Sequence, residues 1–132
     1  MIALDTDVVS LLMRPRPPRV LVERLARTPL DEQSTTAITI GELGFGAEKA
    51  RRPDLLAQAL RALAGVQVLP FDGRAGLAYG RTRAALERQG RRLADPDLRI
   101  AAIAMAHDAV LVTGNVRHFG RVEGLTAEDW TR

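Results

Sequence analysis

Four residues with oxygen-bearing side chains stand next to segments that read as buried strands or helix starts. Asp5 follows the apolar run Ile2–Leu4, and Glu42 lies early in the segment "TIGELGFGAEKA". Asp97 opens "DPDLRIAAIAMAH", and Asn115 follows the apolar run "AVLVT". Oxygen ligands without histidine or cysteine suit a hard cation such as Mg²⁺ or Mn²⁺. Such an ion lowers the pKa of a bound water and stabilises charge on a phosphoryl oxygen, so this set predicts metal-assisted chemistry at phosphate.

Each of these residues also has a purely structural explanation. Asp5 suits the cap of a following helix, Glu42 suits an exposed first turn, and Asn115 suits a left-handed turn. Asp95 and Asp97 both fit the start of a helix, with Asp95 as its N-cap. The metal hypothesis therefore depends on joint placement. It is favoured because ligands of open α/β sheets bind beyond the carboxyl ends of the strands.

Apolar periodicity predicts alternating strands and helices along the whole chain. Strands are expected at 2–4, 33–38, 66–71 and 109–113, with a fifth short element around Leu125. Helices are expected at 6–13, 19–27, 39–50, 53–64, 72–89 and 95–107. Thr6 or Asp7 would cap the first of them and Asp72 would cap the fifth. Gly65 would end the fourth helix and Gly90 the fifth. The pattern predicts one α/β domain over residues 1–132, with a mostly parallel sheet between helices.

Charge and composition narrow the class of partner. The net charge is +3, the pI is about 10.5, and Lys49 is the only lysine. Arginine suits phosphate recognition, so a polyanionic partner fits this charge, although a genome that favours arginine codons explains it equally well. The absence of cysteine excludes disulfides and thiolate zinc sites. No segment has the pattern of a signal peptide or a membrane span, so we expect a cytoplasmic protein.

Five stretches together resemble the PIN-domain ribonucleases, and within them the VapC toxins of bacterial toxin–antitoxin pairs, particularly the FitB-like group. The resemblance covers essentially the whole chain, with the stretches in the family's order and spacing. They are "MIALDTDVVSLLM", "TTAITIGELGFG", "VLPFD", "DPDLRIAAIAMAH" and "LVTGNVRHF". The resemblance implies a PIN-like three-layer α/β/α sandwich and cleavage of RNA that depends on Mg²⁺ or Mn²⁺.

The resemblance also assigns roles to individual residues. Asp5, Glu42 and Asp97 match the family's metal-binding acids, and Asn115 falls at the fourth catalytic position, where an amide supplies no charge. The implied partners are an RNA substrate, a cognate antitoxin and a second copy of the chain. Candidate phosphate contacts, each of which also suits a solvated helix face, are Arg14, Arg16, Arg19, Arg81, Arg83, Arg91 and Arg92.

Five further positions follow from the same comparison with the family pattern. Asp95 lies where relatives often carry an auxiliary acid, and the hydroxyls of Thr6 and Thr113 are expected to support the site. Asp7 stands where many relatives have asparagine. His118 stands where an aspartate often precedes the final phenylalanine, and we expect it to be a loop residue and not a general base.

Two other functions remain open on the sequence alone. "LDTDVV" matches the aspartate pair of haloacid-dehalogenase-like phosphatases, with Asp5 as nucleophile and Asp7 as general acid. That mechanism needs a later lysine, and Lys49 is the only one present. A non-catalytic domain that binds RNA or a protein partner is the other alternative, which the neutral Asn115 leaves open.

Overall fold

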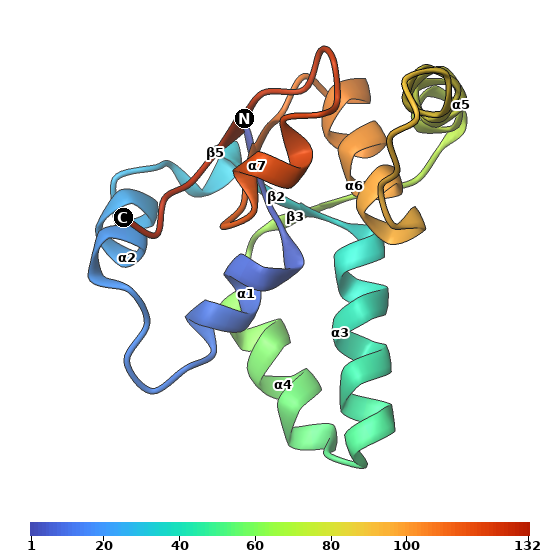
Figure 1. Cartoon of the computed structure of the whole chain (residues 1–132). Coiled ribbons are helices and arrows are strands. Elements are labelled where there is room, and N and C mark those ends of the chain that lie inside the picture. The colour runs from blue at the N-terminus through green and yellow to red at the C-terminus, as the bar shows by residue number, and fades with distance from the viewer.

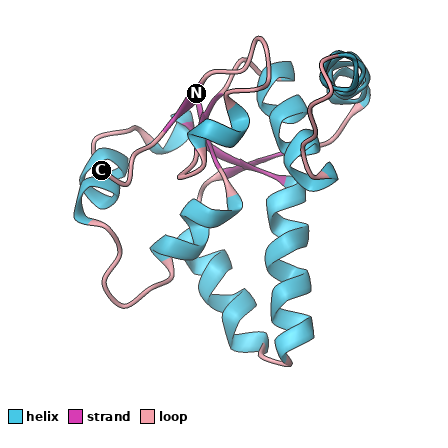
Figure 2. Cartoon of the chain, in the orientation of Figure 1, coloured by secondary structure: helices cyan, strands magenta, loops and turns pink.

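Five short strands form the centre of the computed structural model, which describes residues 1–132. Their order is β3-β2-β1-β4-β5, and every neighbouring pair is parallel. Figure 2 shows these strands enclosed by helices. The strands are β1 (Ile2–Leu4), β2 (Gln33–Thr36), β3 (Gln67–Leu69), β4 (Val110–Val112) and β5 (Ala127–Glu128).

Helices connect all the strands except β4 and β5, which are joined by a segment containing one short helix. Figure 1 shows α3 and α4 side by side, extending together away from the sheet. None of the helices has the length and apolarity that a membrane span requires. The helices are α1 (Thr6–Leu12), α2 (Arg19–Ala26), the 3₁₀ turn η1 (Leu30–Glu32), α3 (Ala37–Ala50), α4 (Pro53–Ala62), α5 (Gly73–Arg88), α6 (Asp95–Ala106) and α7 (Val116–Phe119).

The two faces of the sheet are covered by different helices because successive strand residues point to opposite sides. Ala3 of β1 packs in one apolar cluster with Leu86 of α5 and Leu98 of α6. Leu4, the next residue, packs in a separate cluster with Val8 of α1 and with residues of α2. The central strand is thus buried on both faces, as its continuous apolar sequence predicts. The three-layer α/β/α sandwich is confirmed.

The boundaries of several elements differ from those predicted. The strand expected at 33–38 ends at Thr36, because the Thr36 hydroxyl accepts a hydrogen bond from the backbone N–H of Thr39 at 3.1 Å and so starts α3. The strand expected at 66–71 shortens to 67–69, and the fifth strand begins at Ala127, two residues beyond Leu125. At the end of β2, helix capping overrides the apolar pattern.

Among the predicted helix caps, Asp72 and Asp5 are confirmed, whereas Thr6 or Asp7 for the first helix and Asp95 for the sixth are wrong. Asp72 caps α5 as expected, its carboxylate accepting from a backbone N–H of the first turn. The first helix is capped by Asp5 and not by Thr6 or Asp7. Helix α6 has no side-chain cap, because Asp95 is itself the first helical residue. The carboxylate at position 5 therefore has a structural role before any chemistry is considered.

The packing of α6 against the sheet generates the first test. Ile103 is fully buried, whereas Leu77 on α5 is 69% exposed. We expect Ile103→Ala to lower the free energy of unfolding by about 2–4 kcal/mol through lost burial and a residual cavity. Leu77→Ala, the matched control, should cost less than about 1 kcal/mol. Urea denaturation followed by circular dichroism measures both, and equal costs would contradict the layer assignment.

Candidate active site

The sheet contains one point where the direction of strand addition reverses. From β1 the chain adds β2 and β3 on one side, and then crosses to place β4 on the other side of β1. Leu4 is in register with Val112, so the residues that follow them, Asp5 and Thr113, lie together at the carboxyl ends of the two strands. Such a reversal is where open parallel sheets bind their ligands.

Asp5 is held in place by two hydrogen bonds at this point. Its Oδ2 accepts from the Thr113 hydroxyl at 2.8 Å, and its Oδ1 accepts from the Thr6 backbone N–H at 2.8 Å. The side chain is buried, with only 6% of the residue exposed. The capping role and the site role are therefore compatible, because each carboxylate oxygen serves a different donor.

The surroundings of Asp5 disfavour its charged form. Burial raises the pKa of Asp5 to about 7, and repulsion from Asp7 and Asp97 acts in the same direction. The hydrogen bonds from Thr113 and Thr6 oppose this effect without cancelling it. A carboxylate in this position gains from a nearby positive charge.

Glu42 reaches the same rim from α3 through a chain of hydroxyl groups. The Thr6 hydroxyl donates to Glu42 Oε1 at 2.7 Å and lies 3.0 Å from the Thr39 hydroxyl. The Thr36 hydroxyl donates to that of Thr39 at 3.3 Å. Because a hydroxyl has one proton to donate, the chain runs from Thr36 through Thr39 and Thr6 to the carboxylate. The predicted supporting role of Thr6 fits this geometry.

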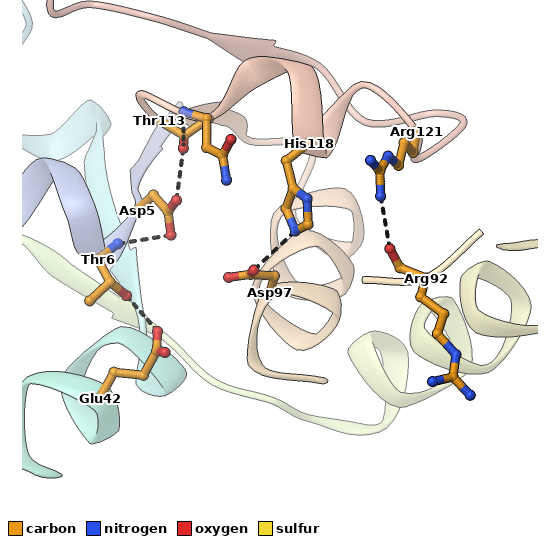
Figure 3. Close-up of polar contacts among 9 residues, drawn as sticks. Asp5, Thr6, Glu42, Arg92, Asp97, Thr113, His118 and Arg121 are labelled. Carbon is orange, nitrogen blue, oxygen red and sulfur yellow. Dashed lines mark hydrogen bonds and ion pairs between the residues drawn. The ribbon is translucent and has the colours of Figure 1, made fainter. Parts of the chain in front are cut away.

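Asp97 approaches from the first turn of α6. Figure 3 shows Asp5, Glu42 and Asp97 on three different elements around one region. The effect of Asp97 on the pKa of Asp5 reflects their closeness. The single hydrogen bond of the Asp97 side chain is with His118 of α7, whose Nε2 lies 3.2 Å from Asp97 Oδ2. His118 was expected to be a loop residue, and the structure places it beside the acids.

Asn115 lies close to this group by its backbone. Its N–H donates to the Thr113 hydroxyl at 3.0 Å, and its side chain makes no hydrogen bond. Its φ of −113° excludes the left-handed turn that was the structural alternative. Asp7 accepts from the Gly114 N–H at 3.0 Å and so ties α1 to the loop after β4.

Asp95 does not belong to this group. Its carboxylate accepts from the Tyr79 hydroxyl and, at 2.6 Å, from Arg99 Nε. These contacts lower the pKa of Asp95, the Tyr79 hydrogen bond being the larger cause. The auxiliary role of Asp95 stays a prediction: its carboxylate is engaged with α5 and with its own helix, and it lines one hollow together with Glu42.

The side chains around this point are of the chemical type that binds a hard divalent cation, but they are not clustered in this structure. The facing groups are carboxylates, and the buried Asp5 carries the largest penalty for ionisation without a counter-charge. No three acidic or histidine side chains lie close enough together to form a ready-made metal site. Glu42 is engaged by Thr6 and Asp97 by His118. The ligand roles of Asp5, Glu42 and Asp97 stay predictions.

The contacts that sequence reasoning missed all join residues far apart in the chain. His118 and Asp97 are 21 positions apart, and Thr6 and Thr39 are 33 apart. Neither pair has a periodic or local signal.

The hollow on one side of Glu42 measures about 280 Å³ and the hollow on the other about 540 Å³, so this carboxylate is accessible from both faces of α3.

Comparison with known proteins places the chain among others of this architecture. The PIN-domain family model matches residues 2–125. The chain is 35% identical to ribonuclease VapC1 of Haemophilus influenzae over 131 residues, which covers 98% of this chain and 97% of the relative. It is also 35% identical to the tRNA(fMet)-specific endonuclease VapC of Shigella flexneri, over 97% of this chain and 96% of that one.

Solved structures agree with these relatives. The toxin–antitoxin complex VapBC-1 from nontypeable Haemophilus influenzae superposes with a TM-score of 0.85 at 34% identity, over the full length of both chains. DNA-bound VapBC from Salmonella typhimurium gives 0.89 at 32% identity, over 98% of this chain and 99% of that one. The chain belongs to the PIN-domain family and, within it, to the VapC ribonucleases, as the five sequence stretches predict.

The raised pKa of Asp5 predicts how stability depends on pH in the metal-free protein. Its folded-state pKa of about 7 exceeds the ordinary 3.8, so the folded state binds the proton more tightly between these values. Stability from this group is full below about pH 4 and is lost as pH rises to 7. Asp5→Asn removes that loss: its amide oxygen can accept from the Thr6 N–H, and its amide N–H can donate to the Thr113 hydroxyl, so that hydrogen bond is kept with its direction reversed. We expect the free energy of unfolding of the variant to be about 2–4 kcal/mol higher than that of the parent at pH 8, and nearly the same at pH 4.5.

Urea denaturation in the presence of a chelator measures this difference. Asp31→Asn, at an exposed aspartate of η1, is the control and should change stability by less than about 0.5 kcal/mol at both pH values. An Asp5→Asn protein no more stable than the parent at pH 8 would show that burial does not disfavour the charge.

Proposed function

We propose that this chain is the toxin of a toxin–antitoxin pair and a metal-dependent endoribonuclease that hydrolyses RNA phosphodiesters. The observation that carries the proposal is that three different elements place Asp5, Glu42 and Asp97 around the point where strand addition reverses. The names of the relatives support the reaction, since they are ribonucleases and an endonuclease specific for tRNA(fMet). The proposed cofactor is Mg²⁺ or Mn²⁺, and the proposed setting is the cytoplasm.

The chain's own residues hold and orient the reacting groups. Asp5, Glu42 and Asp97 would bind the ion, which when present activates water and stabilises charge on the phosphate. Thr113 and Thr6 fix the carboxylate of Asp5 so that it does not have to reorganise when the ion arrives. The uncharged side chain of Asn115, free of protein hydrogen bonds, would orient water or a phosphate oxygen without adding negative charge.

The phosphatase alternative has no structural support. It requires a lysine near the paired aspartates, but Lys49 lies at the far end of α3, with its Nζ 5.9 Å from the centre of the Phe45 ring. Asp7, the required general acid, is occupied by the Gly114 N–H. The non-catalytic alternative is an outcome of the activity test below.

RNA would reach the site along unpaired arginines beside α6. Arg91 and Arg92 line an open hollow of about 210 Å³ between α5 and α6, and neither forms an ion pair. Arg83, in the same hollow, is already paired with Glu87. Arg19, by contrast, is paired with Glu23 on α2. Arg14, Arg16 and Arg81 form no ion pair either, and Arg91 and Arg92 are favoured as phosphate contacts because the hollow that they line adjoins α6, which carries Asp97.

The proposed partners are a cognate antitoxin and a second copy of this chain. The similar solved structures support the first, because those of Haemophilus influenzae and Salmonella typhimurium are VapBC complexes. Exposed apolar side chains also remain on several helices, among them Val20 and Val22 on α2 and Leu60 on α4. Such side chains are available for burial in an assembly.

Removing one acid tests the reaction. We expect Asp5→Asn and Asp97→Asn to lower the rate of RNA cleavage with Mn²⁺ by about 100-fold or more, because each loses a charged ligand of the ion. Asp95→Asn is the matched control on the same helix turn and should cleave at close to the parental rate, because its carboxylate faces Tyr79 and Arg99. Cleavage of a labelled RNA measures all three.

Two outcomes would contradict the proposal. Parental rates in Asp5→Asn or Asp97→Asn would remove the mechanism. A parent protein that binds RNA but does not cleave it with either ion would favour the non-catalytic alternative.

Replacing the free arginines tests the path of the RNA. We expect the double variant Arg91→Gln, Arg92→Gln to raise KM for RNA with little change in kcat. The slope of log binding constant against log salt should become shallower by about 1.4, about 0.7 for each lost phosphate contact with a single strand. Arg61→Gln, at an exposed arginine in the last turn of α4, is the control. An unchanged salt slope would place the RNA elsewhere.

A further inference from the structure

The contact between His118 and Asp97 is the one polar interaction that fixes the orientation of the Asp97 carboxylate. His118 Nε2 lies 3.2 Å from Oδ2, and the Asp97 side chain has no other hydrogen bond. Figure 3 shows the second carboxylate oxygen pointing toward the Asp5 side of the site. The two oxygens of Asp97 are thus distinguished, one held by the imidazole and one left available.

The chemistry of the pair fixes the direction of this hydrogen bond. An ionised carboxylate can only accept, so the Nε2 atom must carry the proton and donate. Nε2 is thereby occupied by Asp97, which does not leave it free to take a proton from water. The contact through Nε2 therefore describes an orienting group, and the lone pair that remains on the imidazole is that of Nδ1.

The backbone that carries His118 is anchored on both sides of the contact. The neighbouring Phe119 is buried in the core and packs edge-to-face against the His118 ring, with 5.7 Å between ring centres. Three residues after His118, Arg121 donates to the carbonyl oxygen of Arg92 at 3.1 Å. Arg92 belongs to the segment that leads into α6, so α7 is fastened both to the core and to the approach of Asp97 (Figure 3).

We propose that His118 is a positioning residue that presents one oxygen of Asp97 to the divalent cation. The inference rests on the proposed function, because it takes Asp97 as a metal ligand. Carboxylate ligands are commonly held by such outer hydrogen bonds, whose loss weakens metal binding by about 10–100-fold. The role belongs to this chain's own sequence, since α7 places an imidazole and no additional carboxylate against Asp97.

Metal binding without RNA tests the proposal directly. Titration calorimetry with Mn²⁺ alone should show affinity about 10-fold or more weaker for His118→Leu than for the parent. His118→Gln should remain within about threefold of the parent, because its amide N–H can donate to the same oxygen. With RNA, His118→Leu should lower kcat and leave KM nearly unchanged. If His118 served only in folding, the Leu and Gln variants with equal melting temperatures would bind Mn²⁺ equally, and glutamine would not restore the affinity.

Arg117→Gln is the matched control on α7, since the Arg117 side chain forms no hydrogen bond or ion pair, and it should bind Mn²⁺ like the parent. Equal Mn²⁺ affinity in His118→Leu and the parent would overturn the inference while leaving the proposed function intact. A parent that binds no Mn²⁺ would overturn both.

A second comparison covers the case in which His118→Leu does not fold. His118→Asn, whose shorter side chain does not reach Asp97, is then compared in the parent and in the Asp97→Asn background, where the carboxylate to be oriented is gone. The inference requires His118→Asn to weaken Mn²⁺ binding in the parent and to weaken it less in that background. An unchanged affinity in the parent, or an equal or larger loss in the Asp97→Asn background, would overturn it.

Discussion

The structure depends on the burial of one carboxylate, that of Asp5, at the carboxyl end of the central strand. Burial without partners would be too costly, so the neighbouring elements must supply donors at fixed positions. Thr113 reaches it from β4 and the Thr6 N–H reaches it from α1. The order of the strands brings β4 beside β1 and so makes this possible. These hydrogen bonds do not fully offset the cost of ionising the buried carboxylate, so a nearby cation would stabilise its charged form.

Threonine hydroxyls link the fold to the site. Thr36 ends β2 and starts α3, and the same residue begins the series of hydroxyls that ends at Glu42. Threonine suits this work because its branched side chain packs well in a strand while its hydroxyl can both donate and accept. The elements that form the core are thereby the elements that orient the acids. Changes at these threonines would affect stability and chemistry together.

The acidic residues divide by their partners and not by their type. Asp7 accepts a hydrogen bond from the Gly114 backbone N–H, and Asp95 accepts from side chains of α5 and α6. Both carboxylates therefore join separate parts of the fold. Asp7 and Asp97 both lie close enough to Asp5 to repel its charge, but the Asp7 carboxylate is held by the Gly114 backbone N–H, whereas Asp97 contacts only the His118 side chain. Repulsion between carboxylates destabilises the metal-free protein. Such repulsion is typical of functional sites, where a bound cation offsets it. The acids that face the rim are therefore the ones that carry the proposed activity.

The sequence by itself determined the layers, the parallel sheet and the identity of the three candidate acids. Apolar periodicity and helix signals such as Asp72 and Gly90 are local, so they can be read from neighbouring residues. Only the tertiary structure decided that Asp95 turns to Tyr79 and that His118 holds Asp97. Those choices depend on the angle at which separate helices meet the sheet, which packing of the whole core sets. A residue type shows what bond a side chain can make, and the fold selects the partner.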